Sequence, residues 1–389
     1  EDIQGNFNVT TALRKPGSAI KPVNYALGLL TKKITLATVL NDMPTCFSVS
    51  GQPLYCPSNY DSSFHGPVQV RFALGNSYNI PAVKMLALNT LQEFVPFARK
   101  MGLATLQDPT QYGLSLTLGG GEVRMTDMAV AFGTFSNLGI KQPLTSILKV
   151  EDYQGKVWEE TKTQEGERVL PMEVAYLISH LLLDNNARSA AFGPSSYLVV
   201  KNHPEVSVKT GTTNDKKDNW IIGYNPDFLV ATWVGNNDNT PMSAVASGIT
   251  GASPIWNKIM SNVLKDQKPN WPLKPEGVIG ANVCNFSGLA PNAAPDQGGC
   301  PTRFEYFLEG TIPTQTENLK QTILINKDTG QPVQTGETQP PNSEFQEHQV
   351  ITDPLGTIYC LDCQPPASIP PITINPAKLP FPTPSSNQE

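Results

Sequence analysis

The sequence predicts an α+β domain followed by a proline-rich C-terminal segment. Helical patterns occupy much of residues 18–187, whereas residues 206–236 hold three β-rich stretches separated by turn residues. Of the 35 prolines, 19 lie in residues 266–389, and such a composition gives loops, short edge strands and polyproline stretches rather than a large core. We therefore expect two units, residues 1–265 and 266–389.

The first unit begins with helices. Regularly spaced apolar residues predict a helix over residues 18–40, and further helices over residues 67–104 and 122–138. Residues 41–66 are interrupted by Pro, Gly, Asn and Asp, so we expect a loop there. The helices therefore come before most of the strands in this unit.

The second half of the first unit is expected to be mainly β. Residues 147–160 have the pattern of a hairpin with a turn near Gly155, and residues 171–187 have that of a helix. The β-rich stretches of residues 206–236 predict an antiparallel meander because short turns separate them. Residues 254–264 close the unit as a helix.

Composition and charge exclude several function classes. The 389-residue chain has a formal net charge of −6 and a pI of about 5.4, which argues against nucleic-acid binding. No apolar run approaches the roughly 18 residues that a membrane span requires. The chain starts at Glu1 without a visible signal peptide, so we expect an upstream piece to be missing. We expect neither a cofactor nor a metal.

The six cysteines occur in three closely spaced pairs. Such spacing in loops fits disulfides formed in an oxidising, extracytoplasmic compartment. The alternative is a zinc site that combines the C-terminal CxxC with the preceding pair, although the spacing between them differs from that of a zinc ribbon. The pairs are Cys46 with Cys56, Cys284 with Cys300, and Cys360 with Cys363.

Three short motifs follow one another along the first unit. Ser18 and Lys21 form S-x-x-K, Ser77 and Asn79 form S-x-N, and Lys209 begins K-T-G. K-T-G occurs once, whereas the first two motifs are weak when taken singly. The order of the three motifs therefore carries more information than any one of them.

Local context favours the S-x-x-K at Ser18. This serine follows a Pro-Gly pair and opens the predicted helix, so Lys21, three residues on, lies on the same helical face. A second S-x-x-K at residues 146–149 lies in a predicted strand, where the first and last residues point to opposite faces. We therefore assign the chemistry to the first motif.

These residue types suit nucleophilic catalysis. A serine hydroxyl becomes nucleophilic when an adjacent base takes its proton, and a lysine serves as that base when burial or nearby positive charge lowers its pKa. We therefore predict Ser18 as the nucleophile, Lys21 as its base and Ser77 as a proton relay. Asn79 offers an amide that can donate to and accept from a peptide substrate.

The K-T-G motif predicts a carboxylate site at a strand edge. Lys209 supplies a cation, and Thr210 and Thr212 supply hydroxyls, beside the serine. The backbone N–H of Thr212, together with that of Ser18, is expected to form an oxyanion hole. Gly211 lets the substrate backbone approach the strand closely.

The three motifs together resemble the signature of the penicillin-recognising enzymes with an active-site serine. Longer segments are similar to class A penicillin-binding proteins, the bifunctional peptidoglycan synthases; they include RKPGSAIKP, CPSNYDSSFHGPVQVRFALGNSYNIPAVK, LTLGGGEVRMTDMAVAFGTFSNLG and KTGTTNDKKDNWIIGYNPDFLVATWVGN. The likeness covers about residues 5–265. The later segment NVCNFSGLAPN…CPTRFEYFLEGTIPT resembles the region that follows this domain in some members.

The resemblance implies a penicillin-binding, β-lactamase-like fold with an antiparallel five-stranded sheet flanked by helices. It implies a DD-transpeptidase that attacks the penultimate D-Ala of a stem peptide, releases the terminal D-Ala, passes the acyl group to an amine and is inhibited covalently by β-lactams. The family's glycosyltransferase domain, its membrane anchor and the first strand of the transpeptidase domain would belong to a missing upstream part. The implied location is the outer face of a bacterial cell membrane, with cell-wall synthesis proteins as further partners.

Two other functions stay open. A DD-carboxypeptidase or β-lactamase would form the same acyl-enzyme and pass it to water, although no Glu stands out as the group that activates this water. A penicillin-recognising sensor would be acylated without turnover. Turnover with a stem-peptide donor and an amine acceptor discriminates among these functions.

The histidines and two aromatic residues are expected to be structural. Trp220 and Tyr224 follow the K-T-G strand, and core packing is the expected role of both. The histidines show no metal-ligand spacing and are expected at ordinary surface or core positions. They are His65, His180, His203 and His348.

Overall fold

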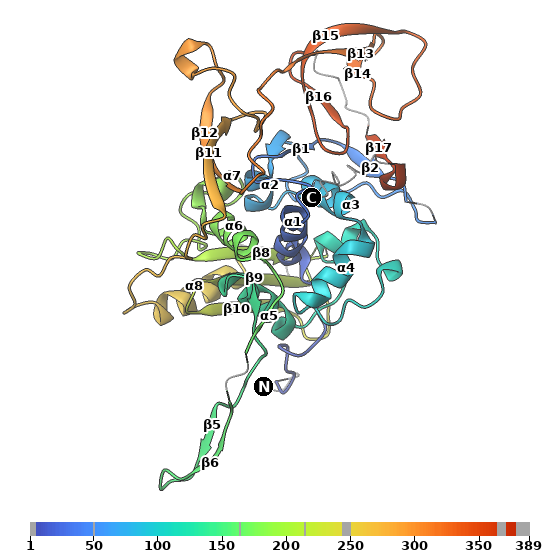
Figure 1. Cartoon of the computed structure of the whole chain (residues 1–389). Helices are drawn as coiled ribbons and strands as arrows, with labels where there is room; N and C mark the ends of the chain where they lie inside the picture. Colours follow the sequence, from blue (N-terminus) through green and yellow to red (C-terminus); the bar gives the residue numbers. More distant parts are fainter. Residues whose placement is uncertain are drawn as a thin grey trace, which may run out of the picture.

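The computed structural model describes residues 5–49, 51–162, 165–213, 215–242, 250–363 and 371–378. Figure 1 shows a central body of helices and a sheet, with a narrow hairpin at one end and the C-terminal strands at the other. Within the described residues, no helix combines the length and the apolar character that a membrane crossing needs.

Helices dominate the first part of the central body, as the apolar spacing predicts. A 3-10 turn, η1 (Gly17–Ile20), leads into α1 (Lys21–Leu30), which is shorter than predicted because the chain turns after Leu30 and enters a strand. The predicted helical segments within residues 67–104 correspond to three helices. The remaining helices are α2 (Val70–Gly75), α3 (Asn79–Asn89), α4 (Leu91–Lys100), α5 (Met125–Ser136), α6 (Met172–Leu183), α7 (Asn185–Phe192) and α8 (Ala252–Val263), with 3-10 turns η2 (Pro109–Gln111) and η3 (Leu114–Leu118).

The central sheet is the predicted antiparallel meander. It consists of β8 (Ser207–Thr212), β9 (Asp218–Tyr224) and β10 (Leu229–Gly235), in the order β10-β9-β8. The expected count of five strands is not found, because no further strand pairs with β8 or β10 among the described residues. The described residues before η1 form turns and one isolated bridge, Arg14 to Val123, and therefore add no strand to this sheet.

Both faces of the sheet are covered because side chains alternate along each strand. On β9, Trp220, Ile222 and Tyr224 pack into the main core, which also contains residues of α1, α5 and α6. Their neighbour Ile221 packs with Trp256 of α8 on the opposite face. Trp220 and Tyr224 are 0% and 2% exposed, so the expectation of core packing is confirmed for both.

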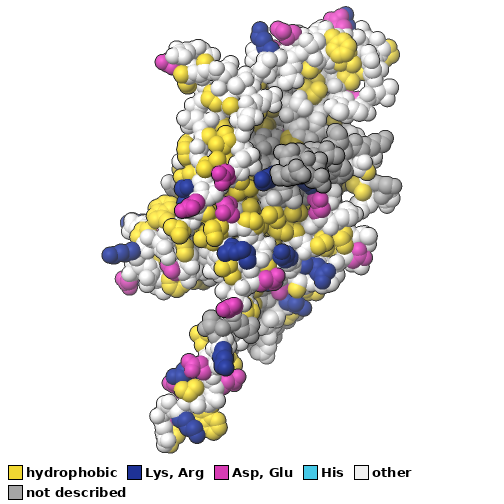
Figure 2. Space-filling view, in the orientation of Figure 1, with side chains coloured by type: hydrophobic (Ala, Val, Ile, Leu, Met, Phe, Trp, Pro, Cys, Tyr) yellow, Lys and Arg dark blue, Asp and Glu magenta, His cyan; other side chains and the backbone are white. Residues whose placement is uncertain are grey.

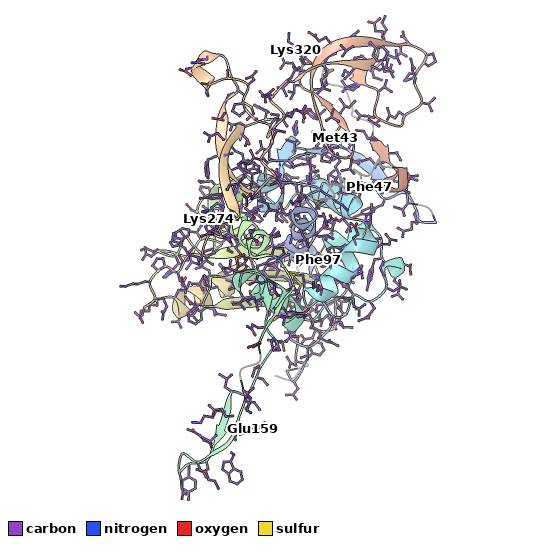
Figure 3. All side chains as sticks on the ribbon, viewed as in Figure 1. Met43, Phe47, Phe97, Glu159, Lys274 and Lys320 are labelled. Atoms are coloured by element: carbon purple, nitrogen blue, oxygen red, sulfur yellow. A yellow bond between two sulfur atoms is a disulfide. The ribbon has the colours of Figure 1, made fainter. Side chains whose placement is uncertain are left out.

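Short strands occupy part of the region predicted as loop. β1 (Val39–Asp42) pairs antiparallel with β3 (Gly66–Gln69), and β2 (Thr45–Phe47) lies between them in sequence. Met43 and Phe47, both labelled in Figure 3, are buried at this end of the helical body. The loop prediction missed these strands because their pairing partners are not adjacent in sequence. The Pro, Gly, Asn and Asp residues on which it rested carry no information about such pairing.

The predicted hairpin is present. β5 (Lys149–Glu151) pairs with β6 (Val157–Glu160), and every residue of both strands is exposed. Figure 2 shows this hairpin as a narrow projection whose surface mixes hydrophobic and charged side chains, and Glu159 marks it in Figure 3. A smaller pair, β4 (Ile140–Lys141) with β7 (Glu167–Arg168), connects it to the body.

The C-terminal segment is richer in strands than predicted. β11 (Val278–Cys284) pairs with β12 (Thr302–Leu308), and a four-stranded sheet has the order β14-β13-β15-β16. Lys320, labelled in Figure 3, begins β13. The strands are longer than proline content suggests because the prolines lie mainly between them. The sheet consists of β13 (Lys320–Asn326), β14 (Gln331–Pro332), β15 (Ser343–Thr352) and β16 (Ile358–Cys360), and the 3-10 turns are η4 (Pro295–Gln297) and η5 (Pro376–Lys378).

The C-terminal segment contacts the helical body through buried ion pairs. Arg71 of α2 donates to Glu305 of β12 at 2.5 Å, and the Glu305 side chain is fully buried. Lys84 of α3 lies 2.7 Å from Asp353, and both side chains are 0% exposed. In addition, β17 (Ile372–Ile374) pairs in parallel with β2. The segment is therefore joined to the body by contacts that its composition did not reveal.

All three expected cysteine pairs are disulfides. They join Cys46 to Cys56, Cys284 to Cys300, and Cys360 to Cys363. The zinc alternative is wrong for this structure, because the cysteines that it needed as thiolates are bonded in pairs.

Candidate active site

The S-x-x-K motif packs directly on the K-T-G strand. Gly17 has a φ of +55°, and a Cβ there would lie 2.6 Å from the Thr212 carbonyl oxygen. A Cβ at Gly211 would collide with the Pro16 carbonyl oxygen. The two glycines therefore let the start of η1 and the strand β8 meet backbone to backbone, which sets Ser18 beside Thr212.

Lys21, the first residue of α1, is fully buried. Its Nζ donates to the carbonyl oxygens of Ser77 at 2.5 Å and Tyr78 at 3.1 Å, and to Asn79 Oδ1 at 2.8 Å. It lies 3.4 Å from Ser77 Oγ. These partners are all neutral, and burial, together with the charge of Lys209, holds the pKa of Lys21 well below its usual value. Such a lysine loses its proton at a lower pH than an exposed lysine does.

Lys209 reaches the same serine from the strand. Its partner across the ladder is Ile222, whose side chain packs into the main core, so Lys209 also faces the helical body. Its Nζ donates to Ser77 Oγ at 2.8 Å and to the Thr210 carbonyl oxygen at 2.8 Å. Burial lowers the pKa of Lys209 to about 7. The Ser77 hydroxyl therefore lies between two buried lysines.

The S-x-N motif forms the connection between α2 and α3. Ser77 has a φ of +63°, a strained conformation for a residue with a Cβ. The Asn79 side chain accepts from Lys21 and donates through Nδ2 to the Ser58 carbonyl oxygen at 2.8 Å. Backbone strain and side-chain bonds thus fix both polar groups of the motif toward the lysines.

These residues surround a cavity of about 330 Å³. Of the predicted site residues, Ser18, Ser77, Asn79, Thr210 and Thr212 line it. The other three predicted residues are Lys21, Lys209 and Gly211, which do not line the cavity. Both lysines bond to Ser77, and Gly211 contacts η1.

The predicted nucleophile and its predicted base are not bonded to each other in this structure. Among the described residues, no hydrogen bond joins the Ser18 hydroxyl to Lys21 or Ser77. Catalytic hydrogen bonds in unliganded sites are often long and tighten only when substrate is bound. The structure thus joins Lys21, Ser77 and Lys209 by hydrogen bonds and places Ser18 in the lining of the adjacent cavity.

Several cavity residues escaped the sequence analysis. Asn59, Tyr60 and Asp61 come from the segment between β2 and β3, and Tyr78 is the middle residue of S-x-N. Polar and turn-forming residues are ordinary in loops, so no local signal marked the first three. Their place in the site depends on the disulfide-bonded loop folding back over α3.

The histidines lie outside this cavity. His65 is the nearest to it and contacts Asp42 and Asp61. His348 has Asp362 and the Cys360–Cys363 pair within 4.8 Å, a grouping that sequence spacing did not reveal. Both of those sulfur atoms are joined in the disulfide.

Comparison with known proteins identifies the family. Residues 5–261 match the model of the penicillin binding protein transpeptidase domain, and residues 274–322 match that of the penicillin-binding protein 1A C-terminal domain. Penicillin-binding protein 1A of Clostridium botulinum is 33% identical over 330 residues, and that of Neisseria meningitidis is 27% identical over 344 residues. Each alignment covers 82% of this chain but 39% and 42% of the relative, so the chain spans about two fifths of their length.

A solved structure of a related protein supports this family assignment. The crystal structure of penicillin-binding protein 1A from Haemophilus influenzae superimposes with a TM-score of 0.71 at 28% identity, over 81% of this chain and 51% of that one. The transpeptidase match takes in all three motifs and more than half of the chain. The chain therefore belongs to the penicillin-binding protein transpeptidase family.

Proposed function

We propose that this chain is a peptidoglycan DD-transpeptidase that works through an acyl-enzyme on Ser18 and is acylated there by β-lactams. The observation that carries the proposal is the Ser77 hydroxyl between two buried lysines, beside the cavity that Ser18 lines. Such a cluster supplies the proton acceptor that a serine nucleophile needs at moderate pH.

The first step forms the acyl-enzyme. Neutral Lys21 takes the Ser18 hydroxyl proton as Oγ attacks the carbonyl carbon of the penultimate D-Ala. The C–N bond then breaks, and the terminal D-Ala leaves as an amine that receives the proton through Ser77. The backbone N–H groups of Ser18 and Thr212 stabilise the oxyanion between these two events.

The second step transfers the acyl group. The acceptor amine attacks the Ser18 ester carbonyl and gives a proton to Lys21. The ester C–Oγ bond then breaks as the amide forms, and the leaving Ser18 Oγ takes the proton back from Lys21. Lys209, Thr210 and Thr212 bind the carboxylate of the donor peptide. Asn79 and the edge at Gly211 hold the peptide backbone.

Transfer to an amine is favoured over hydrolysis by the lining of the cavity. Among its described lining residues, the carboxylate is that of Asp61, and Asp61 lies 3.1 Å from His65 Nε2. A water-activating Glu has no counterpart in this set. Because Lys21 could also take a proton from water, the fate of the acyl-enzyme, amide or free acid, has to be measured.

We place the chain outside the cytoplasmic membrane, where stem peptides and β-lactams are met and where disulfides form. The three disulfides support this location. We place the boundary between the transpeptidase unit and the C-terminal segment near residue 265, close to the end of α8.

Mass spectrometry after incubation with a labelled penicillin tests the proposal. One adduct is expected, on the peptide that contains Ser18, and Ser18→Ala should remove it. An adduct at Ser146, or none on folded protein, contradicts the assignment. Turnover of a stem-peptide donor with an amine acceptor then separates the three candidate activities: cross-linked product for a transpeptidase, free acid for a hydrolase, and a stable adduct for a sensor.

A further inference from the structure

The N-terminus of α3 is capped by a residue from another segment. Tyr78, the residue before the helix, makes no side-chain cap. Instead, the Asn79 backbone N–H donates to Asn59 Oδ1 at 2.7 Å. A helix start leaves its first N–H groups without intrahelical partners, so Asn59 satisfies a donor that the helix itself cannot. The bond also ties the S-x-N motif to the loop that follows Cys56.

Asn59 is held in turn by a buried carboxylate. Its Nδ2 donates to both oxygens of Asp42, at 2.9 and 2.8 Å, and to the Ser63 carbonyl oxygen at 2.8 Å. The Asp42 side chain is 0% exposed and also accepts from the His65 backbone N–H at 3.1 Å. Because every polar atom of the Asn59 amide is bonded, the orientation of this amide is fixed.

A ring stack secures the middle residue of the motif. The His65 ring lies 3.9 Å from the Tyr78 ring, with an interplanar angle of 16°. Its Nδ1 lies 2.6 Å from Asp42 Oδ2, and its Nε2 lies 3.1 Å from Asp61 Oδ2. Asp42 therefore acts on the motif by two routes, through Asn59 to Asn79 and through His65 to Tyr78.

The charge of Asp42 also reaches the lysine cluster. It raises the pKa of Lys21, against the lowering by burial and by Lys209. No other carboxylate contributes to the pKa shift of Lys21 among the described residues. Asp42 thus bears on both the geometry and the protonation of the predicted base. The other titratable groups that contact Asp42 or feel its charge are Tyr25, His65, Tyr78 and Lys84.

We infer that Asp42 and Asn59 are positioning residues for the proposed acylation, which hold S-x-N against Lys21 from the β1 side of the cleft. The inference rests on the proposed function. The neighbouring residue Asn41 can serve as a control for this inference, because successive residues of a strand face opposite sides. Asn41 donates to the carbonyl oxygens of Ile351 and Thr357 in the C-terminal segment, whereas Asp42 bonds to Asn59 and His65.

The experiment compares two pairs of variants of the full chain. Asp42→Asn is matched by Asp353→Asn, which also removes the charge of a fully buried carboxylate near β1. Asn59→Ala is matched by Asn41→Ala, which also removes a buried amide. Each variant is measured for its second-order rate constant of penicillin acylation from pH 5 to 10 and for its thermal unfolding midpoint.

Different outcomes are expected for the two positioning residues. Asn59→Ala should slow acylation by up to about 10²-fold, the effect of displacing a group by about 1 Å, with an unchanged pH profile. Asp42→Asn should also slow acylation and shift the rise of the profile to lower pH, because Lys21 loses the charge that favours its protonated form. The controls should lower only the unfolding midpoint.

The inference is overturned if Asn59→Ala acylates at the wild-type rate, or if the two controls slow the folded protein as much as their partners do. Should Asp42→Asn not fold, the Asn59→Ala and Asn41→Ala pair still decides the positioning role. Wild-type protein that takes up no penicillin would contradict the proposed function instead, so the two failures are distinguishable.

Discussion

Two regions of the molecule bury lysine side chains, and they do so in opposite ways. In the cleft, Lys21 and Lys209 are 0% and 3% exposed and donate to neutral oxygens. At the contact with the C-terminal segment, Lys84 is 0% exposed and donates to the Asp353 carboxylate and to Thr357 Oγ1, both at 2.7 Å. Burial lowers the pKa of all three, and for Lys84 the carboxylate opposes this lowering.

The difference separates the lysines proposed to act in the reaction from a structural one. Without a counter-ion, a buried ammonium group is unstable and tends to give up its proton, which a general base requires. With a counter-ion, the same burial keeps the charge and makes removal of either partner costly. The two regions can therefore be probed with the same kind of substitution and should respond in different observables.

The largest expected effect is that of ending the chain at Leu264. This truncation removes Asp353 from Lys84 and Glu305 from Arg71. Losing the buried partner of Lys84 costs about 3–5 kcal/mol, a large share of the roughly 5–15 kcal/mol that stabilises a whole domain, whereas Arg71 keeps Asp184 at 3.0 Å. We expect the truncated protein to be unfolded or aggregated by circular dichroism and light scattering. A soluble truncated protein with the full acylation rate would show that the C-terminal segment is an independent appendage.

Lys21→Ala should abolish most of the acylation without unfolding the protein. Losing a general base typically costs on the order of 10²–10⁴ in rate, and no ion pair is broken. The measurement is the rate of penicillin adduct formation by intact mass, with Lys258→Ala as a surface control. Wild-type acylation by a folded Lys21→Ala protein would remove Lys21 from the mechanism.

Lys84→Met should show the converse behaviour. It leaves the Asp353 carboxylate buried without its cation, at a cost of about 3–5 kcal/mol in the free energy of unfolding, measured by urea denaturation. The double variant Lys84→Met with Asp353→Leu should recover most of this loss, because a buried pair can be replaced by apolar groups at little cost. Acylation by the folded fraction should remain at the wild-type rate, and a loss of acylation at unchanged stability would break the comparison.

The smallest effect concerns the pH dependence of carboxylate binding. Burial lowers the pKa of Lys209 to about 7, so its charge is present below pH 7 and is lost as the pH rises through 7. Preference for a carboxylate-bearing ligand over an analogue without the carboxylate should fall above pH 7, by up to about tenfold per pH unit. Using the ratio of the two acylation rates cancels the contribution of Lys21. A constant ratio from pH 6 to 9 would argue that Lys209 acts on Ser77 alone.

The sequence analysis was most accurate where the information is local. The apolar spacing after Lys21 predicts a helix, and the turn near Gly155 predicts a hairpin; α1 and the pair β5–β6 are both present. The meander β8–β10 was predicted for the same reason, since its strands are consecutive and joined by short turns.

Long-range partners could not be predicted. Asp353 is 269 residues from Lys84, and Glu305 is 234 residues from Arg71. A single Lys or Asp in a sequence gives no indication of burial, because most such residues are solvated. The same limit concealed the role of Asn59, whose bond to Asn79 depends on how a loop folds back over a helix start.

The distance in sequence between Lys84 and Asp353 also affects the order in which parts of the molecule can fold. A chain synthesised from its N-terminus exposes α3 long before residue 353 exists, so the site for Lys84 stays unfinished until nearly the whole chain has emerged. Contacts of such long range make folding slow and leave partly folded species exposed to association. The disulfides link cysteines 3 to 16 residues apart, so each can form soon after its second cysteine is made. None of them connects α3 to the part of the chain that contains Asp353. The helical body therefore holds Lys84 without its carboxylate partner until the last part of the chain is made.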